Sequence, residues 1–182
     1  MSYKRYPDEM SKLIQLGERS RLFCCVKTSD HPYKYSFYMK VWDADQPGHA
    51  IYFPPGRWLA LTEIRHHVDE ALQLIQQGKF VYNTRHIGGG VYVNSKSPFN
   101  VVDIRMKVFD YNLKEEVYSE TGVTLDPKEW EDLKNCISYV EEQFPVILET
   151  TPCYQDDSHM NQMGMLTCPE CCPFAAQYDT TL

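Results

Sequence analysis

The sequence predicts an α+β protein of antiparallel sheet and long helices, and three observations carry this expectation. Short segments alternate apolar and polar residues, as in GVYVNS (90–95) and NVVDIRMKVFD (100–110), which is typical of half-buried strands. Two longer segments place apolar residues at helical spacing behind a proline. Strands and helices also recur in the same order in both halves of the chain, which indicates a repeat.

The best defined element is a helix predicted from Pro127 to about Gln143. Asp126 is a favourable N-cap, and Pro127 fits the first helical position because its missing N–H has no helical partner there. Glu129, three residues after the cap, completes a capping box. Pro145 limits the far end, since the residue before a proline avoids helical geometry.

An earlier helix is predicted from Pro55 to about Gln77, ending at Gly78, which suits a C-cap. It matches the later helix at a constant offset of 72 residues. The matched pairs are Pro55 with Pro127, Trp58 with Trp130, Leu61 with Leu133, and Ile64 with Cys136. We expect both tryptophans to anchor the core where a strand passes into a helix.

Strand segments upstream match at an offset of 67: FYMKVWD (37–43) with IRMKVFD (104–110), and RLFCCV (21–26) with the strand ending GVYVN (90–94). Each repeat is therefore predicted to be a curved antiparallel sheet followed by one long helix, which covers one face of the sheet. The other face is solvated or used for binding. The predicted division is a first repeat over residues 11–78, a second over 79–144, and a cysteine-containing tail over 145–182.

Composition limits the classes of function. Hydrophobic residues make up 43% of the chain, enough for a packed core, and the 13 tyrosines are typical of β-rich surfaces or base-stacking platforms. A net charge of −7 argues against coating nucleic acid by bulk electrostatics, so any such binding needs a local basic face. The opening MSYKRYPDEMSKL lacks the apolar core of a signal peptide, and no window approaches a membrane span. We expect a nuclear or cytoplasmic protein with no membrane contact.

The second repeat resembles the transcriptional positive coactivator four family, Whirly-like proteins that bind single-stranded DNA. The segments GGVYVN, VVDIRMKVFDYN and GVTLDPKEWEDLKNCISYVEEQ carry the likeness, and the first repeat is a more divergent copy. Family members form dimers in which two four-stranded sheets and two helices make one module. The resemblance therefore implies an intramolecular pseudo-dimer, in which a covalent link replaces bimolecular association.

The resemblance places Arg105 where the family's arginine binds the DNA backbone. Lys107 lies two residues further on, so an unbroken strand puts both side chains on one face. Lys96 falls in the first hairpin, where the family carries basic and aromatic residues, although the family's second lysine is missing here. The alternative for Arg105 and Lys107 is an ordinary solvated polar face.

The first repeat contains HPYKYSFYMKVW (31–42), in which aromatic and cationic residues alternate. A stacked base contributes about 1–3 kcal/mol, and cations follow the phosphates. The candidate binding residues here are Lys34, Lys40, Tyr33, Tyr35 and Tyr38. The alternative is that these tyrosines serve only the β-propensity of a strand. Tyr38 occupies the position that matches Arg105, so we expect the two halves to bind asymmetrically.

The segment RHIGGGVY (85–92) adds Arg85 as a candidate nucleic-acid contact. Its triple glycine does not complete a dinucleotide-binding fingerprint. We interpret the segment as a flexible loop that leads into a strand.

The C-terminal segment TPCYQDDSHMNQMGMLTCPECCPF (151–174) suggests a zinc site. Cys168 and Cys171 form a CxxC pair typical of a zinc turn, and Cys153 with His159 would complete four ligands. Two other interpretations stay open: an extended tail that packs over the sheets through its apolar residues, or a tail of free thiols.

The leading hypothesis is a non-enzymatic protein that binds single-stranded DNA or melted duplex, as a transcriptional coactivator or a replication or recombination factor. Transcription or replication proteins are its expected protein partners. The sequence contains no nucleophile–base motif, phosphate-binding loop or convincing carboxylate pair that would indicate an enzyme. One alternative is a protein-interaction scaffold that has lost nucleic-acid binding, and another is a small zinc-dependent module that works through its tail.

Overall fold

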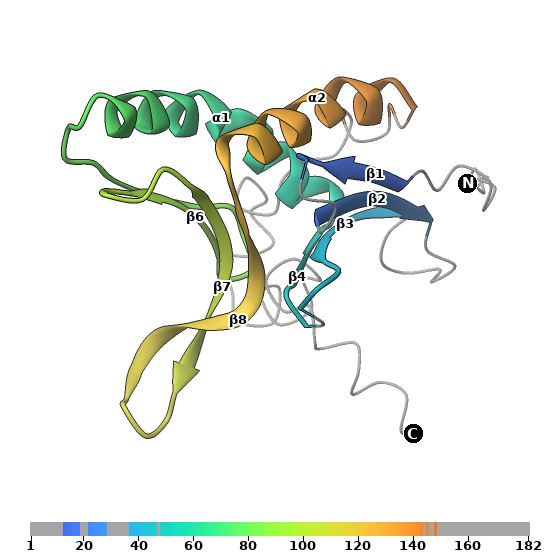
Figure 1. Ribbon diagram of the computed structural model, residues 1–182. Coiled ribbons are helices and arrows are strands. Elements are labelled where there is room, and N and C mark those ends of the chain that lie inside the picture. The colour runs from blue at the N-terminus through green and yellow to red at the C-terminus, as the bar shows by residue number, and fades with distance from the viewer. Residues whose placement is uncertain are drawn as a thin grey trace, which may run out of the picture.

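The chain folds into two four-stranded antiparallel sheets, each followed by a helix (Figure 1). The computed structural model describes residues 13–18, 22–28, 37–46, 48–143, 145 and 148. The first sheet has the order β1(Leu13–Leu16)–β2(Leu22–Thr28)–β3(Phe37–Asp43)–β4(Ala50–Phe53) and leads into α1(Pro55–Gln76). The second has the order β5(Tyr82–His86)–β6(Val91–Lys96)–β7(Val102–Asp110)–β8(Glu115–Leu125) and leads into α2(Pro127–Gln143). The predicted α+β class is confirmed.

Burial along β7 alternates as the sequence predicts. Val102, Ile104 and Met106 are buried, whereas Arg105 and Lys107 between and beyond them are partly exposed. Successive side chains of a strand point to opposite faces, so one face of the sheet packs into the core and the other meets solvent.

Both helix predictions agree closely with the structure. Asp126 Oδ1 accepts a hydrogen bond from the Glu129 backbone N–H at 2.8 Å, and Glu129 Oε2 accepts one from the Asp126 N–H at 2.7 Å. This reciprocal pair is the expected capping box, and α2 begins and ends at the predicted residues. The other helix, α1, ends at Gln76, one residue earlier than predicted, and Gly78 follows with a φ of 74°.

Each helix packs against the sheet of the other half of the chain as well as against its own. Besides touching its own sheet at β3 and β4, α1 packs against β5 and β6, while α2 packs against β1 and β2 as well as β8. The Trp130 indole Nε1 donates to Asp69 Oδ1 of α1 at 2.8 Å, and Lys134 Nζ lies 2.9 Å from the same oxygen. A single hydrophobic cluster includes residues of both sheets and both helices. The core is therefore shared by the two halves of the chain.

Candidate nucleic-acid interface

One face of the second sheet is turned away from the helices and carries polar and aromatic side chains. The strand registers set this face, because residues that pair across neighbouring strands point to the same side. We call it the outer face of the second sheet and define it by Tyr82, His86, Tyr92, Asn94, Lys96, Asp103, Arg105, Lys107 and Tyr118.

Lysines and tyrosines alternate across the outer face. Lys96 Nζ lies 4.4 Å from the ring centroid of Tyr82 and 5.4 Å from that of Tyr118. Lys107 Nζ lies 4.5 Å from the ring centroid of Tyr92 and 4.9 Å from that of Tyr118. Each ammonium is within the range of a cation–π contact with two rings. Two cations and three rings thus form one continuous row.

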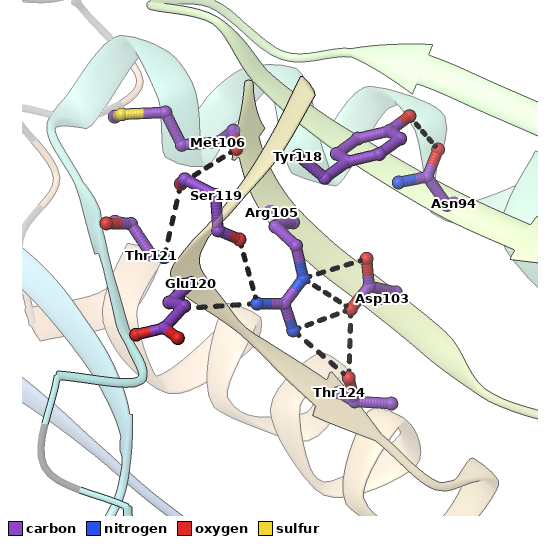
Figure 2. Close-up of polar contacts among 9 residues, drawn as sticks. All are labelled: Asn94, Asp103, Arg105, Met106, Tyr118, Ser119, Glu120, Thr121 and Thr124. Carbon is purple, nitrogen blue, oxygen red and sulfur yellow. Dashed lines mark hydrogen bonds and ion pairs between the residues drawn. The ribbon is translucent and has the colours of Figure 1, made fainter. Parts of the chain in front are cut away.

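The ring of Tyr118 is fixed at the centre of this row. Its hydroxyl donates a hydrogen bond to Asn94 Oδ1 at 3.0 Å, which Figure 2 draws. The rings of Tyr92 and Tyr118 meet edge to face, with centroids 6.4 Å apart. Such edge contacts stabilise aromatic pairs and hold both rings in a defined orientation.

The outer face favours negative charge. A hydrogen bond with Lys96 and the positive charge of that residue lower the pKa of the Tyr82 hydroxyl below its ordinary value of 10.0, and the Lys107 charge acts in the same direction. Any anion placed beside these ammonium groups is stabilised in the same way. Lys96 and Lys107 therefore make their part of the face favourable for anions in a protein of net charge −7.

Arg105 also belongs to the outer face, but its guanidinium is bound within the protein (Figure 2). Nε and Nη2 donate to the Asp103 carboxylate, and the Nη2–Oδ1 distance is 3.0 Å. Nη1 donates to the carbonyl oxygens of Ser119 and Glu120, each at 3.2 Å. The Arg105 side chain is only 16% exposed. Its role as a phosphate contact stays a prediction.

His86 lies at one end of the outer face, beside Tyr92. Its ring lies 4.9 Å from that of Tyr92, and its Nε2 accepts a hydrogen bond from the Gly90 backbone N–H at 3.2 Å. Burial, and secondarily the positive charge of Arg57, lower the pKa of His86 below its ordinary value of 6.5, although Glu116 acts in the opposite direction. The folded protein therefore prefers the neutral imidazole.

This preference predicts a pH dependence of stability. Because the pKa of His86 is lower in the folded state, the unfolded chain binds the proton more readily. The free energy of unfolding should fall as the pH drops through 6.5 and level off below the folded-state pKa. His86→Gln keeps an acceptor for Gly90 and should remove this part of the pH dependence. Urea unfolding of both proteins between about pH 7.5 and 5 measures it, and parallel curves would contradict the assignment.

The first sheet carries a smaller group of the same kind. Lys40 Nζ lies 5.2 Å from the ring centroid of Trp42 and 5.5 Å from that of Tyr52. A hollow of about 380 Å³ beside them is lined by Lys40, Trp42, Asp43 and His49 among others. Lys40, like Lys107, projects from the third strand of its sheet.

Other predicted contacts lie elsewhere. Arg85 belongs to β5 and pairs with Val93, whose side chain is buried, so Arg85 is on the opposite face from Tyr82 and His86. Arg85 Nε donates to Asn83 Oδ1 at 3.2 Å. The predicted loop over RHIGGGVY was therefore wrong for Arg85 and His86, which are in a strand. It was right for the glycines, which form a turn with positive φ angles.

Several candidates fall where the structure gives no side-chain position. Tyr38 is in β3 by its backbone, opposite Lys27. The remaining predicted contacts and zinc ligands lie outside the described residues: Tyr33, Lys34, Tyr35, Cys153, His159, Cys168 and Cys171. The tail interpretations stay predictions. Within the described ranges, no three His, Cys, Asp or Glu residues are grouped to hold a metal ion.

The tyrosines of the outer face were not predicted as binding residues from the sequence. Tyr92 occupies a polar position in the alternating strand GVYVNS, so the period of that strand was a usable signal. The same holds for Tyr82, which starts β5 two residues before Thr84. Tyr118 had no such signal, because its place opposite Lys107 depends on an irregular register between β7 and β8.

In comparisons with known proteins, no family model matches the chain, and no curated protein matches its sequence. None of the helices within the described ranges is long and apolar enough to cross a membrane.

Proposed function

We propose that this protein binds single-stranded nucleic acid, in the first place single-stranded DNA, through the outer face of the second sheet. The observation that carries the proposal is the row in which Lys96 and Lys107 each lie between two tyrosine rings. Aromatic rings stack on exposed bases, and neighbouring cations follow the phosphates. A duplex hides the faces of its bases, so such a surface favours the single strand.

The overall charge is compatible with this proposal because several acidic residues lie away from Lys96 and Lys107. Helix α2 carries Glu131, Glu141 and Glu142, and the far end of the β7–β8 hairpin carries Asp110 and Glu115. On the outer face, Asp103 is paired with Arg105, and Glu116 lies on the same side of β8 as Tyr118, two residues nearer the hairpin tip. Binding through so few cations predicts moderate affinity that weakens with salt.

We further propose that the chain is a tandem repeat folded as a pseudo-dimer. Both halves have the same strand order, and the matched segments fall in corresponding strands, β2 with β6 and β3 with β7. The helix of each half packs against the sheet of the other half, and such reciprocal contacts are typical of a two-fold interface. Contacts of β4 with β8 and of α1 with α2 join elements that correspond to each other, as expected near a two-fold axis. The domain boundaries at 78 and 144 belong to this proposal.

The two sheets would bind unequally. Lys40, Trp42 and Tyr52 offer the first sheet one cation between two rings, against two cations and three rings on the second. The second sheet is therefore the main binding surface, and the first extends it. A non-enzymatic role in transcription, replication or recombination, in the nucleus or cytoplasm, follows from this binding.

A second candidate function is a protein-interaction scaffold, and one observation favours it. The tip of the β7–β8 hairpin extends away from the helices and exposes Phe109, Tyr111 and Leu113 at 51%, 85% and 62% (Figure 1). Exposed apolar groups on a projecting ribbon are typical of protein contacts. The tip lies beyond the residues that define the outer face, so variants of Tyr111 and Leu113 and variants of the outer face distinguish the two functions.

The proposal predicts selective binding to single strands. A labelled thymidine oligonucleotide of about 20 nucleotides, and a duplex of the same length, would be titrated with the full chain between about 50 and 200 mM salt. We expect the single strand to bind at least tenfold more tightly than the duplex, with affinity falling as salt rises. Absence of binding at the lowest salt, or equal binding of both forms, would contradict the proposed function.

A further inference from the structure

Strands β7 and β8 are paired irregularly between Arg105 and Lys107, beside the centre of the row of rings and cations. Arg105 pairs with Gly122, but Lys107 pairs with Tyr118, so β8 advances four residues while β7 advances two. In an uninterrupted antiparallel ladder Lys107 would pair with Glu120. The extra residues of β8 form a bulge, which removes a carboxylate from beside Lys107 and puts a ring there.

Arg105 holds this bulge in place. Its Nη1 donates to the carbonyl oxygens of Ser119 and Glu120, both within the bulge. Bulged residues leave the ladder, so their carbonyl groups need other donors. The Ser119 hydroxyl donates to the Met106 carbonyl at 3.0 Å and accepts from the Thr121 N–H at 3.2 Å (Figure 2). Arg105 and Ser119 together replace the missing ladder bonds.

Gly122 lets the strands approach closely at the start of the bulge. A Cβ at this position would overlap the Ile104 carbonyl oxygen and lie 2.8 Å from the Arg105 Cα. Glycine is the residue that tolerates such an approach, because any side chain would push the strands apart. The irregular pairing is therefore built into the sequence at both Arg105 and Gly122.

The guanidinium of Arg105 has no N–H group left for a ligand. An arginine has five N–H donors. Nη1 uses two on the bulge carbonyls, Nη2 uses two on Asp103 Oδ1 and Thr124 Oγ1, and Nε uses one on the Asp103 carboxylate. The Asp103 carboxylate also offsets its charge at 3.0 Å. A phosphate could bind Arg105 only by displacing these partners.

We infer that Arg105 is a positioning residue, which maintains the β8 bulge and thereby places Tyr118 between Lys96 and Lys107. This inference rests on the proposed function and assigns Arg105 a role other than phosphate contact. Without the bulge, Glu120 would face Lys107 and repel the phosphates that the lysine attracts. Arg105 therefore acts on nucleic acid only through its neighbours.

A double-mutant cycle between Arg105→Gln and Tyr118→Ala tests the inference with the same thymidine oligonucleotide. Loss of one stacked base weakens binding about tenfold. Arg105→Gln alone should weaken binding at least as much, and its effect should be clearly smaller once Tyr118 is alanine, because both changes remove the same ring. Additive losses would show that Arg105 contributes independently of Tyr118, as a phosphate contact would.

Arg105→Lys provides the second variant, since it keeps the charge but not the planar fork of donors. A positioning role predicts that it behaves like Arg105→Gln, whereas a phosphate contact predicts near wild-type binding. Cross-strand NMR contacts of the free protein test the register without nucleic acid. The backbone of Lys107 should lie beside Tyr118 in the wild type and lose that contact in both variants. If the register is unchanged in the variants, the inference is wrong, whether or not the protein binds nucleic acid. If the register changes as expected but the wild-type protein does not bind the oligonucleotide, only the proposed function is wrong.

Discussion

Replacement of Trp130 by alanine is expected to lower the free energy of unfolding by about 3–5 kcal/mol. Trp130 is 1% exposed and belongs to the hydrophobic cluster that both halves of the chain share. Its indole also donates to Asp69, which ties α2 to α1. Truncation therefore leaves a large cavity and removes a hydrogen bond between the two helices. Urea unfolding followed by circular dichroism measures the loss.

Phenylalanine variants separate the cavity from the hydrogen bond. Trp58 occupies the corresponding position in α1 and is 0% exposed. Within the described part of the chain, its Nε1 has no hydrogen-bond partner. Trp130→Phe should therefore cost about 1 kcal/mol more than Trp58→Phe, because only Trp130 loses a bond. Equal losses would contradict a stabilising role for the Trp130–Asp69 bond.

The lysine pair of the outer face should have the largest effect on binding. Lys96→Gln combined with Lys107→Gln removes both cations of the row and leaves its rings. An exposed ion pair contributes at most about 1 kcal/mol, so the two together predict a loss of about 30-fold in affinity at low salt. Titration of the variant with the thymidine oligonucleotide measures the loss. Affinity within about threefold of the wild type would contradict the assignment.

A control pair removes the same charge from the helical side of the protein. Arg65 is exposed on α1, and Lys128 is exposed on α2, where it pairs with Asp132 four residues on. Both helices cover the inner faces of the sheets. Arg65→Gln with Lys128→Gln should therefore change affinity only through the net charge, by less than about threefold. A loss equal to that of the lysine pair would indicate bulk electrostatics rather than a site.

Local signals explain what the sequence could predict. The start of α2 depends on three neighbouring residues, Asp126, Pro127 and Glu129, whose interactions are complete within one helical turn. The alternation in β7 likewise reports directly which residues are buried, because the period of a strand is fixed. Helices and strand faces could therefore be derived before any tertiary contact was known.

Pairing between distant residues explains what the sequence could not predict. The position of Arg105 in β7 predicts a surface cation, yet two of its acceptors are carbonyl groups 14 and 15 residues later, in β8. Tyr118 reaches Lys107 only because the bulge shifts the register, and nothing in the alternation of β8 marks that shift. The row of rings and cations is thus a product of the register, and the sequence analysis named its lysines without its tyrosines.

The salt dependence of binding tests the central claim most directly, namely that the outer face of the second sheet is the surface that binds single strands. Each phosphate contact with a single strand contributes about 0.7 to the slope of log K against log salt. Lys96→Gln with Lys107→Gln should therefore reduce the magnitude of the slope by about 1.4, and Arg65→Gln with Lys128→Gln should leave it unchanged. Equal slopes for the wild type and the lysine variant would place the phosphates elsewhere and contradict the claim.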